Sequence, residues 1–207
     1  MSSTTRERII DEAMHLFSRH GYTATSVAKI EAASGLTPGA GGLYHHFDSK
    51  EAVLAAGIER QLSRLDALRE IRRVLTPLGD LRAELTVIAS YILSELDTEA
   101  DLMRILASEA RSRPELLTIA VDRLVTSTFD GFATWMLERA EHPVKRADAT
   151  AIATLGLGAL FSSRLLRHVL GVAVPVDDET LVRTWVALMT SALADSASRP
   201  ALMVDQR

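Results

Sequence analysis

The chain has 207 residues, of which 47% are hydrophobic and 24% charged, and its formal net charge is −4. This composition supplies a buried core and excludes a disordered chain, and the length suits one large domain or a small domain fused to a mid-sized one. Cysteine is absent, which excludes disulfides, thiolate metal sites and thiol nucleophiles.

The amino-terminal residues predict neither export nor membrane insertion. An acid stands between two bases before the first apolar residue, and Asp11 and Glu12 interrupt the apolar run that a signal peptide requires. The longest uncharged stretch, residues 149–163, is shorter than the roughly 18–20 apolar residues that span a bilayer. We therefore expect a soluble, cytoplasmic protein with no membrane segment.

The first two helices are predicted from periodicity and capping residues. Gly21 directly follows the first helix and suits the left-handed conformation of the C′ position, with Tyr22 folding back as the apolar cap. Thr25 or Ser26 then caps a second, short helix that stops at Gly35. The apolar face of the first helix follows the helical period and comprises Ile9, Ala13, Leu16, Phe17 and the carbon stem of His20.

Later segments also have only the helical period, apart from a short alternating run at residues 172–176. A second short helix after the glycine turn ends in residues 43–47, and Ser49 caps a long helix over about 50–73. Proline at the first helical position after Thr76 starts another helix. Further helices are expected at about 77–96, 98–111, 114–141, 146–170 and 178–196. The sequence predicts an all-α fold of about nine helices.

Residues 25–50, together with residues 4–24, resemble the amino-terminal DNA-binding domain of the TetR family of bacterial transcriptional regulators. A tight helix–turn–helix with exposed small, aromatic and cationic groups suits the DNA major groove, which admits one α-helix. The resemblance covers about the first quarter of the chain. It implies a helix–turn–helix domain in residues 1–50 and a ligand-binding and dimerisation domain in residues 51–207, coupled by the long helix after Ser49.

The resemblance also implies which residues meet DNA. Tyr44 and His46 would bind phosphates, His45 a base edge or a phosphate, and Lys50 a phosphate at the start of its helix. Leu43 and Phe47 would instead anchor the short helix in the core, and Pro38 would take its first position. The residues expected to contact DNA are Thr37, Gly39, Ala40, Tyr44, His45, His46, Lys50 and Lys29, of which Lys29 most resembles an ordinary solvated lysine.

The charge balance limits how such a domain binds. Residues 1–60 carry six basic and seven acidic side chains, so bulk attraction to phosphate is absent. Binding would depend on local placement and on a second copy of the domain in a homodimer on a palindrome.

Two features depart from the family pattern. Gly41 and Gly42 lengthen the run to Leu43 by two residues, which would rotate a regular helix by roughly 200°. We therefore expect a longer turn or a bulge, with helix resuming near Gly42. Glu31 stands where a small residue normally permits close helix approach, and we expect the bulkier side chain and the longer turn to compensate for each other.

The last two helices are the expected dimer contacts, although their apolar faces suit the chain's own core equally well. Small residues for close approach are Ala153, Gly156, Gly158 and Ala159. The apolar stripe on the final helix is Leu181, Trp185, Leu188 and Met189.

Aromatic or polar residues on apolar faces are candidates for an effector pocket, each with plain core packing as its alternative. Arg164 and His168 share one helix face, so they are able to receive an anionic group together, unless they are exposed beside Arg167. The pocket candidates are Tyr91, Met103, Trp135, Phe161, Arg164 and His168.

The function that these features favour is a ligand-released homodimeric repressor that binds a palindromic operator. Its partners would be double-stranded DNA, a largely apolar small-molecule effector and a second copy of the chain, without a cofactor or a metal. A transcriptional activator, or a TetR-shaped interaction module that has lost DNA binding, stays open. An enzyme is disfavoured, since the Glu-x-x-His spacing of Glu12 and His15 lacks the second pair that a di-iron bundle needs and no hydrolase or phosphate-loop motif is present.

Overall fold

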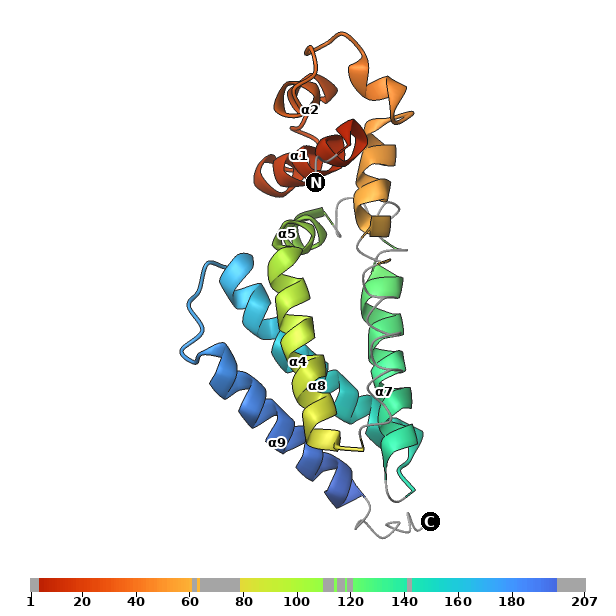
Figure 1. The fold of residues 1–207 in the computed structure, drawn as a ribbon, viewed down its shortest axis with the longest axis vertical. Helices are drawn as coiled ribbons and strands as arrows, with labels where there is room; N and C mark the ends of the chain where they lie inside the picture. Colours follow the sequence, from red (N-terminus) through yellow and green to blue (C-terminus); the bar gives the residue numbers. More distant parts are fainter. Residues whose placement is uncertain are drawn as a thin grey trace, which may run out of the picture.

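The computed structural model describes residues 4–60, 63, 79–109, 114, 118, 121–140 and 143–196. Helices and turns make up this part of the chain, which confirms the all-α prediction (Figure 1). Residues 50–60 form a helix that begins shortly after η1. The other elements are α1 (Thr5–His20), α2 (Val27–Ala33), the 3₁₀ helix η1 (Gly42–His45), α4 (Leu81–Thr98), α5 (Ala100–Glu109), the π-helical turn η3 (Asp122–Thr126), α7 (Ser127–Arg139), α8 (Arg146–His168) and α9 (Asp178–Ser196).

The amino-terminal elements form a head at one end of the long axis of the molecule (Figure 1). Tyr22 is buried and its ring centroid lies 5.0 Å from that of Phe17, so the predicted fold-back after α1 is confirmed. Ser26, rather than Thr25, caps α2 by accepting the Lys29 N–H at 3.3 Å. The Thr25 hydroxyl is buried and donates to the Gly21 carbonyl at 2.9 Å.

The helix predicted from residue 77 begins later, at Leu81. Asp80 caps it, because its carboxylate accepts the N–H groups of Arg82 at 2.9 Å and Ala83 at 3.1 Å. The cap expected at residues 76–77 lies outside the described residues. Gly79, with φ +68°, precedes the cap and turns the chain into α4.

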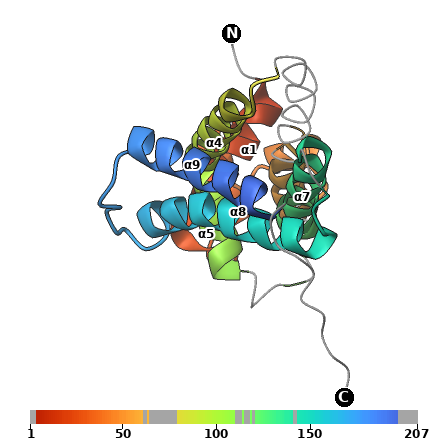
Figure 2. The same ribbon diagram turned by 90° about the horizontal axis from the view of Figure 1, so that it is seen from below.

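The carboxy-terminal half has its own core among α4, α7, α8 and α9, with α9 packed along α4 and α8 (Figure 2). In this core the rings of Phe132 and Trp135 stack at 5.4 Å, and Trp185 donates its indole N–H to the Gly156 carbonyl at 2.7 Å. By length and composition alone, α8 is one helix that could cross a membrane. In the structure its buried face, which includes Ala153 and Leu160, packs into this core.

Helix α5 connects the head to the other half. The core of the head continues past residue 50 to Ile58 and takes in Leu102 and Ile105 from α5. The domain boundary at residue 50 stays a prediction, whereas the packing places the helix over 50–60 within the head.

Candidate nucleic-acid interface

The turn between α2 and η1 departs from a regular helix. Gly39 and Gly41 have φ of +75° and +79°, which favours glycine because a Cβ disfavours this region. Helical structure resumes at Gly42, as a single 3₁₀ turn. The predicted irregular turn is therefore confirmed, but a 3₁₀ turn stands where regular helix was expected, and Pro38 lies in the turn and not at the first position of a helix.

The turn and η1 separate exposed from buried side chains. Leu43 is fully buried and Phe47 is 6% exposed, which confirms them as anchors in the core. The outward-facing set consists of the expected DNA-contacting residues Thr37, Gly39, Ala40, Tyr44, His45 and His46, all exposed, with Tyr44 at 56%. We refer to these six residues as the reading row.

Glu31 supports this turn from inside. Its side chain is fully buried, and its carboxylate accepts the backbone N–H groups of Gly39 at 2.7 Å and Leu43 at 3.1 Å. The sequence identified Glu31 as a departure from the pattern, but the contacts of its carboxylate depend on a chain path that the sequence does not reveal.

The two lysines of the predicted interface make contacts inside the head. Lys50 donates from Nζ to the carbonyls of Tyr22 and Thr25, at 2.8 Å each, and Nζ lies 4.1 Å from the Tyr22 ring centroid. Lys29 is exposed and donates to the Ala24 carbonyl at 3.0 Å. Both contacts tie down the segment between α1 and α2, so phosphate binding by either lysine stays a prediction.

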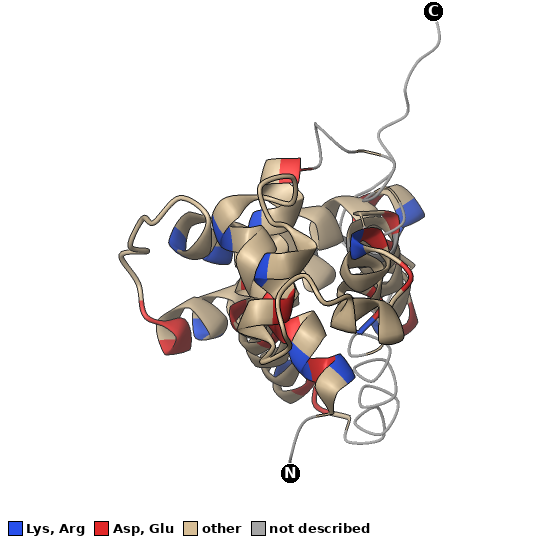
Figure 3. Cartoon of the chain, turned by 90° about the horizontal axis from the view of Figure 1, so that it is seen from above, with Lys and Arg blue, Asp and Glu red and all other residues tan. Residues whose placement is uncertain are grey.

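The charged side chains of the head are dispersed. Viewed from above, basic and acidic segments alternate over the molecule without a continuous basic face (Figure 3). Arg60 pairs with Asp11 at 2.7 Å and with Glu7 at 3.4 Å, which uses one cation internally.

Comparison with known proteins assigns the head. A model of bacterial regulatory proteins of the tetR family matches residues 9–56. The HTH-type transcriptional repressor KstR2 of Rhodococcus jostii is 30% identical over 109 residues, which cover 53% of this chain and 52% of that protein. The HTH-type transcriptional regulator UidR of Escherichia coli is 42% identical over 64 residues, 29% of this chain and 32% of that one. The head of the chain, residues 9–56, is therefore of the TetR-family type.

The fold beyond the head is shared more widely than the sequence. The structure of the fatty acid degradation regulator FadR from Bacillus halodurans matches with a TM-score of 0.67 at 19% identity, and the match covers 91% of this chain and 96% of that chain. This likeness shows that the two chains share their arrangement of helices. In sequence, the chain spans only about half of KstR2 and about a third of UidR.

The TetR-family head contacts the rest of the chain through α5. Asp101 accepts hydrogen bonds from the Ser18 hydroxyl at 2.7 Å and from Arg104 Nη1 at 2.7 Å, and its Oδ2 lies 3.2 Å from His15 Nδ1. Burial favours a higher pKa for Asp101, but these hydrogen bonds and the charge of His15 outweigh it and lower the pKa. His15 is thus placed at an interhelical contact, which the sequence did not predict.

A second contact extends from α5 to α8. Arg104 donates from Nε to the carbonyl of His168 at 2.8 Å. Another bond joins the start of the head's α1–α2 connection to α5, where the Tyr22 N–H donates to Glu109 Oε1 at 3.1 Å. Helix α5 therefore connects the head directly with the carboxy-terminal half.

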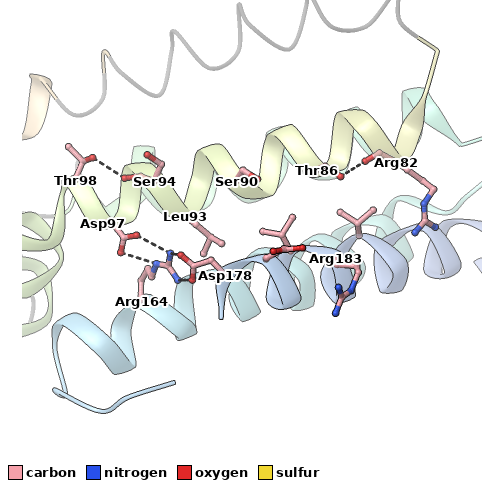
Figure 4. A pocket seen from close by; sticks show the side chains of 13 residues that line it. Arg82, Thr86, Ser90, Leu93, Ser94, Asp97, Thr98, Arg164, Asp178 and Arg183 are labelled. Atoms are coloured by element: carbon pink, nitrogen blue, oxygen red, sulfur yellow. Dashed lines mark hydrogen bonds and ion pairs between the residues drawn. The ribbon is translucent and has the colours of Figure 1, made fainter. Parts of the chain in front are cut away.

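An open cavity of about 710 Å³ lies between α4 and α9 and ends at α8 (Figure 4). Its apolar floor includes Leu93, Val182 and Val186, while Arg82 and Arg183 lie along its length. Hydroxyl groups of Thr86, Ser90, Ser94 and Thr98 on α4 also line it. Its end at α8 carries Asp97, Arg164 and Asp178, so the cavity is charged at that end.

Arg164 forms a buried ionic cluster at that end. Its side chain is 1% exposed, and its guanidinium donates to Asp178 at 2.9 and 2.7 Å and to Asp97 at 2.9 Å. His168 Nε2 lies 2.6 Å from Asp97 Oδ1. The prediction was that Arg164 and His168 together receive the anionic group of a ligand. In the structure the carboxylate of Asp97 occupies that position. Surface exposure of Arg164 beside Arg167 was also wrong.

The other pocket candidates do not line this cavity. Trp135 is buried in the carboxy-terminal core, Met103 is buried on α5, Tyr91 is partly buried and Phe161 is 40% exposed. Core packing explains Trp135, and an effector contact for Tyr91, Met103, Phe161 and His168 stays a prediction.

The two predicted dimer helices carry both internal and exposed faces. Gly156 lies in the chain's own core, since a Cβ there would meet Met189 Sδ at 2.6 Å, and Trp185 is also buried. The outward faces retain large apolar residues, Leu155 at 74% and Leu188 at 60% exposure. Ala153 and Met189 face inward, Ala159 is exposed, and Gly158 and Leu181 are partly buried.

Proposed function

We propose that the chain is a homodimeric transcriptional regulator that acts in the cytoplasm, binds a palindromic operator and is released from it by a small molecule. The observation that carries this proposal is the reading row. Six exposed residues are presented at one end of the molecule on a turn whose flanking side chains, Leu43 and Phe47, are buried. Small and aromatic groups in this arrangement suit the floor and phosphate walls of a major groove. We propose no catalytic activity.

A homodimer supplies the affinity that one head lacks. The dispersed charges give each head little attraction to phosphate, and two heads on a palindrome bind the same duplex cooperatively. Leu155 and Leu188 are large, apolar and exposed on α8 and α9, the two helices expected to form the dimer contact, and exposed apolar residues of this size suit an interface. We expect Leu155→Glu to convert the dimer to monomer in sedimentation analysis. Leu170→Glu, at an exposed leucine beyond α8, is the matched control and should leave the dimer intact.

Effector binding would shift the population between two arrangements of the heads. The contacts of α5 with α1 and with the end of α8 support such coupling, because they connect the head to the helices around the cavity. The expected effector is a largely apolar molecule, and an occupant of the described cavity would also need polar groups for its lining. By linkage, effector and DNA must weaken each other's binding by the same factor.

Fluorescence anisotropy tests the proposal directly. The purified chain is titrated onto labelled duplexes that tile the region upstream of its gene, at several salt concentrations and with unlabelled non-specific DNA as competitor. Binding to one partly palindromic segment that resists the competitor supports the regulator. Equal, weak binding to every duplex of this set and of a randomised pool contradicts it.

The second candidate function is that of an interaction module that has lost DNA binding. It is favoured by the internal contacts of Lys50 and by the acidic excess of the head. This alternative, an interaction module of TetR shape, predicts no salt-sensitive binding to any duplex. An activator would bind the same operator and increase transcription, so a reporter assay distinguishes it from a repressor.

A further inference from the structure

We propose that Glu31 is a positioning residue for DNA recognition, because its buried carboxylate sets the shape of the turn that presents the reading row. This inference rests on the proposed DNA-binding function. Glu31 is fully buried and would not touch DNA. It would act through the backbone of residues 36–43.

The backbone groups of three residues of the turn are held by Glu31. Its carboxylate accepts the N–H of Gly39 through Oε2 at 2.7 Å and the N–H of Leu43 through Oε1 at 3.1 Å. Its main-chain carbonyl accepts the N–H of Leu36 at 2.8 Å. The two carboxylate oxygens therefore fix the spacing between the middle and the end of the turn.

These bonds lie where the turn has no regular helical pattern of its own. Gly39 and Gly41 are both in the left-handed region, and η1 begins only at Gly42. Leu43 is fully buried, so without Glu31 its N–H would be desolvated and unpaired, which is costly. Gly42 packs so closely on Leu36 that an added Cβ would lie 3.4 Å from Leu36 Cδ1. Glu31 therefore stabilises one particular path of the turn.

The buried carboxylate of Glu31 carries a free-energy cost that an apolar side chain would not have. Burial of an acidic side chain is unfavourable unless hydrogen bonds compensate for the lost water. The carboxylate of Glu31 contacts backbone N–H groups and not a cationic side chain in the described part of the head. An apolar side chain of similar size would fill the site without this cost, but it would leave both N–H groups unpaired.

The two departures from the family pattern therefore depend on each other. A turn lengthened by Gly41 and Gly42 has N–H groups that need an acceptor from α2, and Glu31 supplies that acceptor. The shorter family turn has a small residue at this position. It follows that Glu31→Ala should be harmful in the native chain and much less harmful when Gly41 and Gly42 are also deleted.

Amide hydrogen exchange of the full-length protein without DNA tests the contact itself. Gly39 is exposed, so its amide should exchange fast unless the carboxylate of Glu31 holds it. We expect Glu31→Gln, which offers one acceptor and one donor in place of two acceptors, to speed exchange at Gly39 by about tenfold or more. Glu59→Gln removes the same charge from an exposed site of the head and should change nothing at Gly39. A Gly39 amide that exchanges equally fast in wild type and Glu31→Gln overturns the proposal.

Sequence discrimination tests the positioning role. Duplexes are selected by the wild-type protein from a randomised pool. The discrimination ratio is the Kd for the unselected pool divided by the Kd for the selected duplex. Glu31→Gln should lower this ratio by about tenfold, while affinity for the unselected pool stays within about twofold because phosphate contacts survive. Glu31→Ala should lose thermal stability and discrimination, and deletion of Gly41 and Gly42 in that variant should restore both.

The failures of this inference and of the proposed function differ. A wild-type protein that selects no sequence overturns the proposed function and this inference together. A wild-type protein that selects a sequence, with an unchanged ratio in Glu31→Gln, overturns this inference alone.

Discussion

Two buried charged side chains, Glu31 in the head and Arg164 in the carboxy-terminal half, are satisfied in different ways. Glu31 binds backbone N–H groups of its own neighbourhood, and its contacts lie at most 12 residues away along the chain. Arg164 binds the side chains of Asp97, 67 residues away, and Asp178, 14 residues away. The first shapes one turn, whereas the second ties three helices together.

This difference predicts what the loss of each charged side chain would change in the protein. A carboxylate bound only to backbone amides dictates a local path, so its loss should change what the turn presents more than whether the protein folds. A guanidinium bound to two carboxylates on different helices adds to the tertiary fold, so its loss should appear first in stability. The predictions below test this distinction.

The largest stability effect is expected at Arg164. Arg164→Met leaves Asp97 and Asp178 without their main partner. Loss of one member of a fully buried ion pair costs about 3–5 kcal/mol. The two carboxylates are 36% and 49% exposed, so we expect about 2 kcal/mol in urea unfolding after allowance for solvent screening. Arg167→Met, at a 40% exposed arginine with only longer contacts, is the control. Equal losses in both variants would remove the contrast with Glu31.

Lys50 offers a test within the head. Lys50→Met removes two hydrogen bonds to the carbonyls of Tyr22 and Thr25, and we expect unfolding free energy to fall by about 1–2 kcal/mol. If Lys50 acts mainly through these carbonyls, the slope of log Kd against log salt should stay as in wild type. A slope reduced by about one, with unchanged stability, would instead assign Lys50 to a phosphate.

Acid should weaken the ionic cluster that Arg164 forms with Asp97 and Asp178, and so destabilise the fold. Burial favours a higher pKa for Asp97, but hydrogen bonds from His168 and Arg164 outweigh it and lower the pKa. The hydrogen bond from Arg164 lowers the pKa of Asp178, against burial. A depressed folded pKa contributes stability that is complete above the unfolded value, about 3.9, and is lost as pH falls through the folded value.

We therefore expect Tm to fall steeply only below about pH 4. Asp97→Asn should have a lower Tm at neutral pH and a shallower acid decline, because one titrating partner is gone. Thermal melts followed by circular dichroism between acid and neutral pH measure this. An acid decline of the same depth in Asp97→Asn would contradict the assignment.

The smallest effect is expected at Tyr44. Its side chain is 56% exposed, so Tyr44→Phe should leave Tm unchanged. Loss of one neutral hydrogen bond to phosphate should weaken DNA binding by about three- to tenfold. The affinities for selected and for unselected duplexes should fall by the same factor, since phosphate contacts carry no sequence information. A loss confined to the selected duplex would place Tyr44 at a base edge.

Local features could be predicted from the sequence. The end of α1 at His20 follows from Gly21, the bounds of α9 follow from the helical period, and the irregular turn follows from three glycines at positions 39, 41 and 42. Residues that anchor the reading row, Leu43 and Phe47, were also identified correctly.

Contacts between distant segments could not be predicted in the same way. Arg164 and His168 were expected to receive the anionic group of a ligand, whereas both contact Asp97 on α4, to which nothing in their spacing points. The start of α4 was misplaced because several residues in the segment are able to cap a helix, and only the tertiary fold selects Asp80. The partners of Glu31 depend on a non-helical chain path that periodicity does not encode.

The measurement that tests the central claim most directly is hydroxyl-radical footprinting of the wild-type protein on a duplex that it selects. If two reading rows bind the DNA, two protected blocks should appear, one helical turn of about 10–10.5 base pairs, or a whole number of turns, apart. Protection should weaken in both blocks for Tyr44→Phe. A single block, or protection that Tyr44→Phe and Glu31→Gln leave unchanged, would show that another surface contacts the DNA.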